Sequence, residues 1–427
     1  MDRKEFIRSA AILAGTPIYS KLTENNVSTN SLKVGLIGAH GMGWANLQAI
    51  LKVDGVRCIA ICDVDENVLD KRRSELQQQG IEVKTYIDYL ELLKNKDIDA
   101  LIVATPDHWH CLQLTDALKA GKHVYIEKPI GNSIAECRSM VRAVEQAKCM
   151  VQVGQWQRSQ KHFTDAVEFV HTGKLGKVRL VKAWSYLGWK TPISIKPDMQ
   201  VPPGVHYDKW LGPAQSRHFN PNRFHFEFRW FWDYAGGLLT DWGVHLLDYA
   251  LLGMKATQPL SVMAAGGKFA NPQGGAETPD TMTAVYEFDG FNIQWEHAIG
   301  ISGGPYGRDH GVAFIGNNGT LVLDRRGWEV IPEKDRMEAV PFQKASDNGL
   351  ENHMANFVTA IRKKDRSLLH APIQAGGHIA ILSQMGNIAF RTGKKLHWET
   401  EDQKFLEADA NKFITPTYHN GYKLPLS

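Results

Sequence analysis

Residues 32–43 read LKVGLIGAHGMG, an apolar run that ends in a glycine-rich turn. The run from Leu32 to Gly38 has the composition of a buried strand, and a helix is predicted from the turn through Leu51. Glycines let a backbone approach a pyrophosphate, whose negative charge is favoured by the N–H groups at a helix N-terminus. The turn matches a dinucleotide-binding fingerprint, although His40 stands where the second glycine is usual. The predicted cofactor contacts in this turn are Gly38, His40, Gly41 and Met42.

Asp63 ends the second predicted strand, which begins at Val56. Its spacing from the glycine turn is that of a carboxylate that binds both hydroxyls of a ribose. Because a carboxylate at this place repels a 2′-phosphate, the sequence favours NAD over NADP as the cofactor. The alternative interpretation is a tight turn beside an ordinary capping aspartate.

Strand and helix patterns alternate from residue 32 to residue 153, which predicts parallel strands in a doubly wound sheet. Beyond this segment the strands are joined by tight turns. Asp289-Gly290 and Asn317-Asn318-Gly319 each separate two alternating runs, which is a strong hairpin signal. The predicted fold class is therefore α/β, with a dinucleotide-binding domain at residues 32–153 and a substrate-binding domain at residues 154–427. We expect the second domain to be α+β, with a large, mostly antiparallel open sheet.

The composition excludes several classes of partner. The chain has 427 residues, a length that suits two domains with cores of their own. Its formal net charge is +3 and no lysine or arginine run forms a stripe, so we expect no nucleic-acid partner. No apolar run is long enough to span a bilayer, so we expect no membrane partner. Five cysteines without a spacing pattern argue against a disulfide framework.

Residues 1–31 are predicted to form a leader and a linker. Arg3 and Lys4 precede a short apolar stretch at residues 9–14, a pattern similar to a twin-arginine export signal whose second arginine is replaced. Proteins exported by that route fold before they cross the membrane, so a lack of disulfides is compatible with a periplasmic location. A frayed amphipathic leader on a cytoplasmic protein is the alternative.

Glu127-Lys128-Pro129 follows the predicted strand at residues 123–126. The carboxyl end of such a strand is where open α/β sheets bind their ligands. Pro129 ends the strand because it lacks the N–H that a continuing ladder needs. A charged strand end that is simply solvated is the alternative interpretation.

Residues 236–248 are predicted to form a helix that begins with two glycines. In this helix Asp241, His245 and Asp248 fall at i, i+4 and i+7, on one face. Histidine suits proton transfer near neutral pH, and a carboxylate one turn away orients it or raises its basicity. A metal-ligand set and a structural ion network are the alternatives at this point.

These motifs occur in order with Thr105-Pro106-Asp107-His108-Trp109-His110 between them, and the chain resembles the Gfo/Idh/MocA family. The family contains enzymes like glucose–fructose oxidoreductase and inositol dehydrogenase, and the resemblance extends from Leu32 to about Leu424. It implies an N-terminal Rossmann domain that binds NAD(P) and a C-terminal domain with an open, mostly antiparallel sheet. It also implies pairing of the open sheets into a homo-oligomer, a dimer or a tetramer.

The resemblance also implies roles for individual residues. Lys128 is expected to contact the reacting hydroxyl, His245 to act as the general base, and Asp241 to anchor a neighbouring hydroxyl. Since a lysine and a histidine supply the cation and the base that alcohol oxidation needs, no metal is expected. The remaining cofactor contacts that the resemblance implies are Thr105, Pro106, His110, Glu127 and Lys128.

Aromatic and polar side chains near these motifs favour a small carbohydrate as the substrate. Aromatic rings stack on the apolar faces of sugar rings, while arginine, histidine and glutamine bond to hydroxyls. For each tryptophan, burial in a large sheet is the alternative interpretation. The predicted substrate contacts are Trp156, Arg158, Trp184, Tyr186, Arg223, Arg229 and Asp241.

The leading hypothesis is an NAD-dependent oxidoreductase that transfers hydride between nicotinamide and a secondary hydroxyl of a sugar, polyol or glycoside. Oxidation at C3 of a glucoside is one form of it, since residues 201–232 resemble a bacterial subfamily linked to glycoside breakdown. A redox-neutral glycosidase that oxidises, eliminates and reduces with the same NAD is the first alternative. Such glycosidases generally lack the Asp-x-x-x-His arrangement, which favours the dehydrogenase. A non-catalytic sugar or nucleotide binder is the second alternative.

Overall fold

The computed structural model describes residues 31–425, so all of the predicted leader except Ser31 lies outside the described residues. In this part of the chain, the N-terminal domain contains a parallel sheet of six strands in the order β3-β2-β1-β4-β5-β6. This is the strand order of a Rossmann fold, as the sequence predicts. The strands are β1 (Leu32–Ile37), β2 (Val56–Cys62), β3 (Lys84–Tyr86), β4 (Ala100–Val103), β5 (His123–Ile126) and β6 (Val151–Val153).

The central strands of this sheet are mostly apolar, as expected where helices cover both faces. Val34 and Leu36 of β1 and all of β4 are fully buried. Polar residues begin several of the helices: Asp65 and Ser133 accept hydrogen bonds from backbone N–H groups at the starts of α3 and α6. The helices of this domain are α2 (Gly41–Ile50), α3 (Glu66–Gln78), α4 (Tyr89–Leu93), α5 (Asp107–Lys119) and α6 (Ile134–Gln146).

The C-terminal domain contains a sheet of ten strands within the described residues, in the order β14-β13-β12-β11-β7-β10-β9-β8-β15-β16. Every neighbouring pair is antiparallel except β7 and β10. The predicted hairpin at Asp289-Gly290 joins β9 to β10, and Gly290 has the positive φ of 79° that such a turn requires. The strands are β7 (Leu180–Leu187), β8 (Ser261–Gly267), β9 (Thr281–Phe288), β10 (Phe291–Ile299), β11 (His310–Ile315), β12 (Gly319–Asp324), β13 (Gly327–Pro332), β14 (Val340–Lys344), β15 (Leu396–Glu399) and β16 (Lys404–Phe405).

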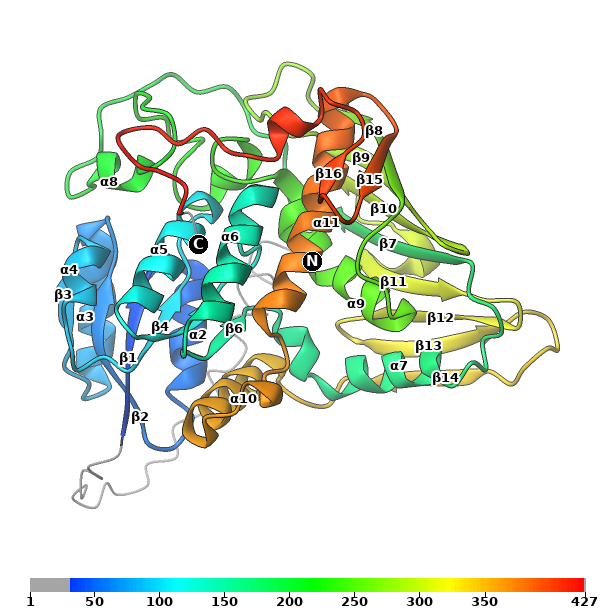
Figure 1. The fold of residues 1–427 in the computed structure, drawn as a ribbon, viewed down its shortest axis with the longest axis horizontal. Coiled ribbons are helices and arrows are strands. Elements are labelled where there is room, and N and C mark those ends of the chain that lie inside the picture. Colours follow the sequence, from blue (N-terminus) through cyan, green and yellow to red (C-terminus); the bar gives the residue numbers. More distant parts are fainter. Residues whose placement is uncertain (1–30, 426–427) are drawn as a thin grey trace.

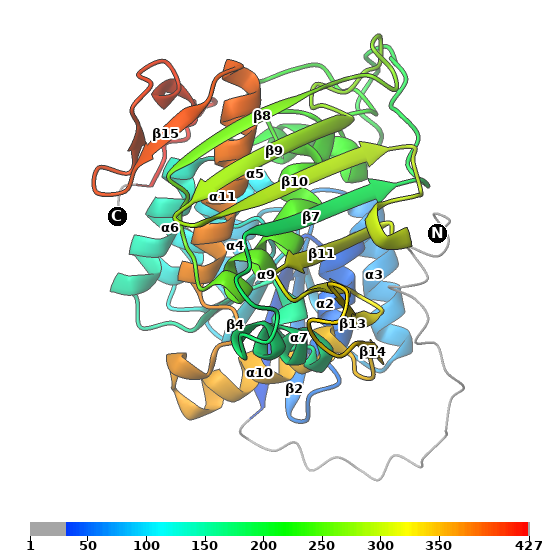
Figure 2. The same cartoon turned by 90° about the vertical axis from the view of Figure 1, so that its right-hand side faces the viewer.

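The two faces of this sheet have different surroundings. Val181 and Ala183 of β7 point to the inner face, where they join the main core with residues of α9 (Val244–Met254) and α11 (Ile373–Thr392). Figure 2 shows strands β8 to β11 from the opposite side, with the helices behind them. The fold class that the sequence predicts is therefore confirmed, including the open face of the second sheet.

Helices from the second half of the chain tie the two domains together. Helix α11 lies between α6 of the first domain and β8 of the second (Figure 1). Helix α10 (Gly349–Lys363) packs on α2, where Phe357 and Ile361 share one apolar cluster with Leu47 and Ile50. The shorter helices α7 (Lys161–His171) and α8 (Tyr207–Leu211) follow β6 in the sequence and belong to the second domain. The active-site motifs are thus held between two domains that share buried surface.

Within residues 31–425 no helix is both long enough and apolar enough to cross a bilayer. The five cysteines are all buried as free thiols, so they behave as small core residues.

Candidate active site

Lys128 and Asp241 meet although 113 residues separate them in the sequence. Lys128 follows β5 at the carboxyl edge of the parallel sheet, where Glu127 N–H still donates to the carbonyl of Val103. The Lys128 Nζ donates to Asp241 Oδ1 at 2.6 Å and to the Asp241 carbonyl oxygen at 3.0 Å. The charged strand end is therefore paired across the domains and is not simply solvated.

Asp241 lies in a π-helical turn, η3 (Leu239–Gly243), which leads directly into α9. The sequence predicts one continuous helix from Gly236, and the structure corrects this: a widened turn precedes the α-helix. Such turns are frequent at functional sites because the extra residue in the turn changes how side chains project. Thr240 Oγ1 accepts a hydrogen bond from Gly236 N–H and so fixes the start of the turn.

Two cations hold the Asp241 carboxylate ionised. Besides Lys128, the Arg229 Nε lies 3.4 Å from Asp241 Oδ1. Burial alone would raise the pKa of Asp241, but the charges of Lys128 and Arg229 more than offset it and hold that pKa well below its ordinary value. The prediction that Asp241 and Arg229 both belong to the site agrees with this geometry.

His245 is the second residue of α9 and is 7% exposed. Burial, followed by the charges of Lys128 and Arg325, lowers the pKa of His245 well below its ordinary value. The imidazole is therefore neutral at neutral pH and has a lone pair free to accept a proton. Its Nδ1 is enclosed and has no hydrogen-bond partner, which leaves Nε2 as the nitrogen that can face a substrate. Trp156 lies edge-on to the ring, with the ring centroids 6.4 Å apart.

The third residue of the predicted helical trio has a different partner. Asp248 accepts two short hydrogen bonds from Arg158, at 2.7 and 2.5 Å, and is 2% exposed. The Arg158 guanidinium also donates to the carbonyl of His370. Arg158 is thus tied to Asp248 and to the His370 carbonyl, and its role as a substrate contact stays a prediction. Asp248 is unavailable as a metal ligand beside Asp241 and His245.

Asp107 is a member of the site that sequence reasoning did not single out. It opens α5, is 7% exposed, and lies close enough to Lys128, Arg229 and Asp241 for their charges to act on it. Burial raises the pKa of Asp107 from its ordinary value of 3.8 to about 8, against the attraction of the two cations. This carboxyl therefore keeps its proton at neutral pH and can donate a hydrogen bond. The only signal in the sequence was its place in the Thr105–His110 motif.

We expect Asp107→Asn to stabilise the cofactor-free protein increasingly as the pH rises from 5 to 7. The folded state keeps a proton that the unfolded chain loses above about pH 4, so the free energy of unfolding of the native chain falls as the pH rises towards 8. The gap in favour of the variant should widen by on the order of 1 kcal/mol per pH unit. Thermal unfolding midpoints at pH 5, 6 and 7 measure it, with the exposed Asp97→Asn as control. A gap that stays constant across this range contradicts the assignment.

The glycine turn brings the backbones of α2, β1 and β4 close together. A Cβ added at Gly43 would lie 1.9 Å from the carbonyl oxygen of Gly38, and one added at Gly38 would lie 2.6 Å from the carbonyl oxygen of Ala104. Only glycine permits this approach of α2 to β1 and β4. The N–H groups of Gly41 and Met42, which open α2, donate to none of the described residues and can meet a pyrophosphate. The residues present therefore fit NAD.

The carboxylate and the histidine of this turn are both held by protein contacts. Asp63 Oδ2 accepts a hydrogen bond from Ala39 N–H at 2.8 Å, and Oδ1 accepts one from Asp65 N–H. Asp63 thus fixes the turn and retains lone pairs for ribose hydroxyls. His40 stacks on His225, which bonds to Asp65 at 2.9 Å. Burial lowers the pKa of His40 to about 4, so this imidazole brings no charge to the turn.

We expect Gly43→Ala to weaken NAD binding at least tenfold. The new methyl group cannot coexist with the Gly38 carbonyl at 1.9 Å, so α2 must move away from the turn that holds the pyrophosphate. Calorimetric titration with NAD measures the loss. Ser74→Ala, at an exposed position of α3 outside the predicted contacts, is the control and should leave NAD affinity unchanged. Equal NAD affinity in Gly43→Ala and the native chain would show that the pyrophosphate binds elsewhere.

The remaining predicted cofactor residues lie near the carboxyl ends of β4 and β5 and differ in how deeply they are buried. Thr105 and Pro106 lie beside Gly38 at the end of β4, where the Thr105 hydroxyl donates to Gln113 at 2.6 Å. Glu127 is buried and accepts a hydrogen bond from Asn46. His110 is 1% exposed, and both of its ring nitrogens lie within 2.8 Å of backbone carbonyls, those of Pro129 and Thr105. The prediction that His110 contacts the cofactor is therefore wrong, since it is a buried spacer between two loops.

Two of the predicted substrate residues lie on the wrong face of the second sheet. Trp184 and Tyr186 project from β7 to the outer face, away from α9 and His245. Trp184 donates to the Arg308 carbonyl in a separate small cluster, and Tyr186 donates to Glu296. The prediction that they contact substrate is wrong, because the periodicity of a strand does not tell which face is covered. Arg223 contacts Phe231 and is not brought to the site either.

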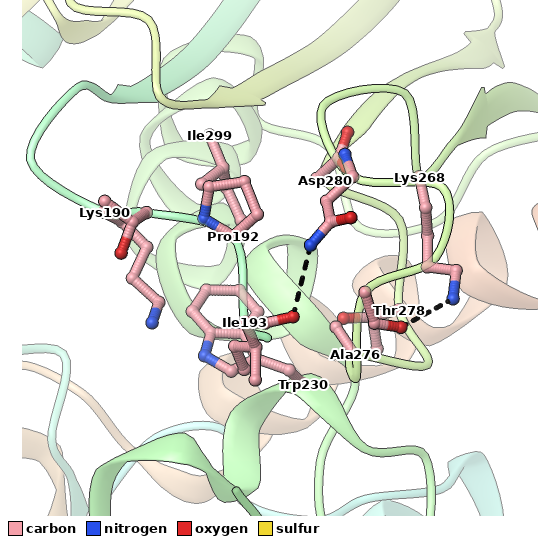
Figure 3. A pocket seen from close by; sticks show the side chains of 12 residues that line it. Lys190, Pro192, Ile193, Trp230, Lys268, Ala276, Thr278, Asp280 and Ile299 are labelled. Carbon is pink, nitrogen blue, oxygen red and sulfur yellow. Dashed lines mark hydrogen bonds between the residues drawn. The ribbon is translucent and has the colours of Figure 1, made fainter. Parts of the chain in front are cut away.

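A cavity of about 20 Å³ lies in the second domain, lined by Lys190, Pro192, Ile193, Trp230 and Asp280 among others (Figure 3). Its volume admits about one water molecule. The cavity is therefore too small for a sugar ring, and it contains none of the side chains that meet around Lys128.

Comparison with known proteins places these features in a family. Residues 32–155 match the family model described as "Oxidoreductase family, NAD-binding Rossmann fold". Residues 177–424 match the model described as "Oxidoreductase family, C-terminal alpha/beta domain" of the Gfo/Idh/MocA group.

Individual relatives match only part of the chain, at about 30% identity. The chain is 30% identical to inositol 2-dehydrogenase of Salmonella paratyphi B over 172 residues, 39% of this chain and 50% of that protein. It is 31% identical to glycosyl hydrolase family 109 protein 1 of Shewanella sp. (strain ANA-3) over 127 residues, 28% of each chain. The chain thus spans half or less of the length of these two relatives.

Among solved structures, myo-inositol 2-dehydrogenase from Lactobacillus plantarum superposes with a TM-score of 0.65 at 18% identity, covering 87% of this chain and 100% of that one. At this identity the likeness concerns the fold. The two family models together span most of the chain, and their boundaries follow the two sheets described above. The chain belongs to the Gfo/Idh/MocA family of oxidoreductases and carries its NAD-binding Rossmann fold.

Proposed function

We propose that the protein is an NAD-dependent dehydrogenase that oxidises a secondary hydroxyl of a sugar, a polyol or a glycoside. The observation that carries the proposal is the meeting of Lys128, Asp241 and a neutral His245 at the carboxyl edge of the sheet that holds the glycine turn. Inositol 2-dehydrogenase among the relatives supports the class of substrate.

Bound NAD supplies a hydride acceptor, held by the residues 38–43, Asp63, Thr105 and Pro106. The protein's own side chains manage the charge and the proton of the alcohol. Lys128 polarises the hydroxyl oxygen and stabilises the negative charge that develops there. Asp241 stays ionised, holds the Lys128 ammonium in place and accepts a hydrogen bond from a neighbouring hydroxyl.

The proton leaves to His245. Its Nε2 accepts the hydroxyl proton as general base, which a neutral imidazole can do throughout the neutral pH range. Trp156 and the enclosed surroundings of His245 exclude water, which strengthens the electrostatic interactions of Lys128 and His245 with the substrate. Trp156 and Arg229 remain proposed substrate contacts, since they flank the catalytic pair.

The proposal is tested by incubation with NAD and a panel of glucosides, inositols, aldoses and sugar acids, with NADH absorbance as the readout. We expect NADH formation with a subset of the panel and its loss in Asp241→Asn. Absence of NADH with every member, in protein that binds NAD by calorimetry, would overturn the proposal.

A redox-neutral glycosidase is the second candidate, favoured by the match to a glycosyl hydrolase family 109 protein. That reaction uses the same first step, then eliminates the aglycone, adds water to the resulting double bond and returns the hydride. Release of free sugar from a nitrophenyl glycoside with no net NADH, together with solvent deuterium in the product, would select it over the dehydrogenase.

We also propose that the protein forms a homo-oligomer and that it is exported. The open outer face of the ten-stranded sheet exposes Met263, which supports pairing of that face with a second copy. Arg3 and Lys4 support export of the folded chain. Light scattering of the purified protein and fractionation of the native cells test these two proposals.

A further inference from the structure

Arg325 reaches the active site from the turn between β12 and β13, and none of the motifs includes it. Its guanidinium lies over Trp242 at 4.5 Å and over Trp156 at 5.1 Å. Trp242 follows Asp241 in the chain, and Trp156 lies against His245. The cation is thus sandwiched between two aromatic rings that both border the catalytic pair, an arrangement that fixes its plane.

This guanidinium has no anionic partner among residues 31–425, although its neighbours do. Arg326 bonds to Asp324 at 2.6 Å, and Arg308 is paired with Asp324. The nearby carboxylate of Asp309 bonds to His310 at 2.8 Å. Arg325 forms no hydrogen bond with the described residues, and its Nε is fully enclosed. Since the side chain as a whole is only half-buried, its terminal nitrogens are left to meet a ligand.

An unpaired, partly buried arginine is costly to keep, so its persistence calls for a partner. Burial lowers the pKa of Arg325 to about 10, which still leaves it cationic at neutral pH. A fixed planar guanidinium presents paired N–H donors whose spacing matches the two oxygens of a carboxylate.

The carboxylates near Arg325 do not contact it directly. Asp241 is paired with Lys128 and Arg229, and the charges of Asp241 and Asp309 act on Arg325 only from beyond the distance of an ion pair. A carboxylate on a ligand could therefore make the direct contact with this guanidinium that the described carboxylates do not make.

We propose that Arg325 binds a carboxylate on the substrate, so that the enzyme acts on a sugar acid such as a hexuronate or its glycoside. This inference rests on the proposed dehydrogenase for its reaction, whereas the binding step stands on Arg325 itself. The hydroxyl that is oxidised lies at Lys128 and His245, and the carboxylate lies at the tryptophan sandwich. Arg325 then determines specificity and takes no part in the proton transfer.

The test compares matched substrates that differ only in charge: methyl glucuronide, its uncharged methyl ester, and methyl glucoside. In native protein we expect kcat/KM for the acid to exceed that for the ester by about 100-fold, because a charge-assisted bidentate contact is absent from the ester. High salt should reduce the value for the acid and leave that for the ester unchanged. This comparison needs no variant, so it does not depend on how a substituted chain folds.

Arg325→Met should remove about 100-fold of kcat/KM for the acid, mainly through KM, and less than threefold for the ester. Arg325→Lys should restore part of the loss, since it returns the charge without the planar fork. Arg326→Met, an exposed arginine at the next position, is the matched control and should leave the preference intact.

Calorimetric titration of the NADH-loaded protein with the glucuronide gives a readout independent of turnover. Binding that is lost in Arg325→Met, with no NADH formed from any polyol, would support the carboxylate site and overturn the dehydrogenase. NADH formed equally from acid and ester, with the same response in Arg325→Met, would overturn the carboxylate site and leave the dehydrogenase standing. A preference for a sugar phosphate over the uronide would also overturn it.

Discussion

Replacement of Lys128 by methionine is expected to lower kcat/KM for alcohol oxidation by about 10³-fold, a loss much larger than the change in NAD affinity. The ammonium is the donor that meets the oxygen as negative charge develops, and it is already aimed by two bonds to Asp241. A preorganised donor of this kind acts in the transition state more than in the ground state, so the loss should appear in kcat. Steady-state NADH formation and NAD calorimetry measure the two quantities.

Two controls separate this effect from loss of structure. Lys119→Met, on the exposed side of α5, should keep full activity. Lys128→Met also leaves Asp241 with Arg229 as its remaining partner, so a lower unfolding temperature is expected, and activity must be measured well below it. The double variant with Asp241→Asn should be little worse than Lys128→Met, because the two residues act as one unit. Activity within tenfold of the native value would contradict the role of Lys128.

Replacement of His245 by glutamine is expected to lower kcat/KM by about 10²- to 10⁴-fold, the range for removal of a general base. The pH profile gives the sharper test. A base works only in its unprotonated form, so activity persists above its pKa and falls below it. Because burial and the neighbouring cations lower the pKa of His245 well below its ordinary value, native activity should not decline at pH 6.5. His245→Gln should lose any acid limb that the native enzyme shows.

His218→Gln serves as the matched control, since that imidazole is exposed in the irregular segment between β7 and α9. A native profile that falls between pH 7 and pH 6, and that is unchanged in shape in His245→Gln, would assign the base to another group.

The fold could be predicted because each strand and helix carries its own period and its own turn residues. Parallel strands such as β4 are apolar throughout, and Asp289-Gly290 marks a hairpin by itself. The contact of Lys128 with Asp241 could be predicted in outline, since each residue belongs to a recognisable motif. The contact itself depends on how the two domains pack.

The failures at the site have one physical cause, which is that burial belongs to the assembled chain. Trp184 and Tyr186 lie on one face of β7, as the two-residue period of a strand predicts. Which face of β7 is covered, however, depends on where α9 packs. Arginine is a residue type that often binds ligands, but in this fold the Arg158 guanidinium is paired with Asp248. Arg325 could not be predicted because it lies in a turn 80 residues beyond His245 and belongs to no motif. Its place beside the site depends on packing between Trp156 and Trp242.

Helix α10 has a consequence for how this protein can be divided. Phe357 and Ile361 complete the apolar cluster that Leu47 and Ile50 begin, so part of the core of the nucleotide-binding domain comes from residues about 310 positions later in the chain. A fragment that ends after β6 would expose this apolar surface to water and would therefore be prone to aggregate. The two halves are therefore poor candidates for exchange between relatives, and recombination would succeed only where α10 travels with the sheet it covers.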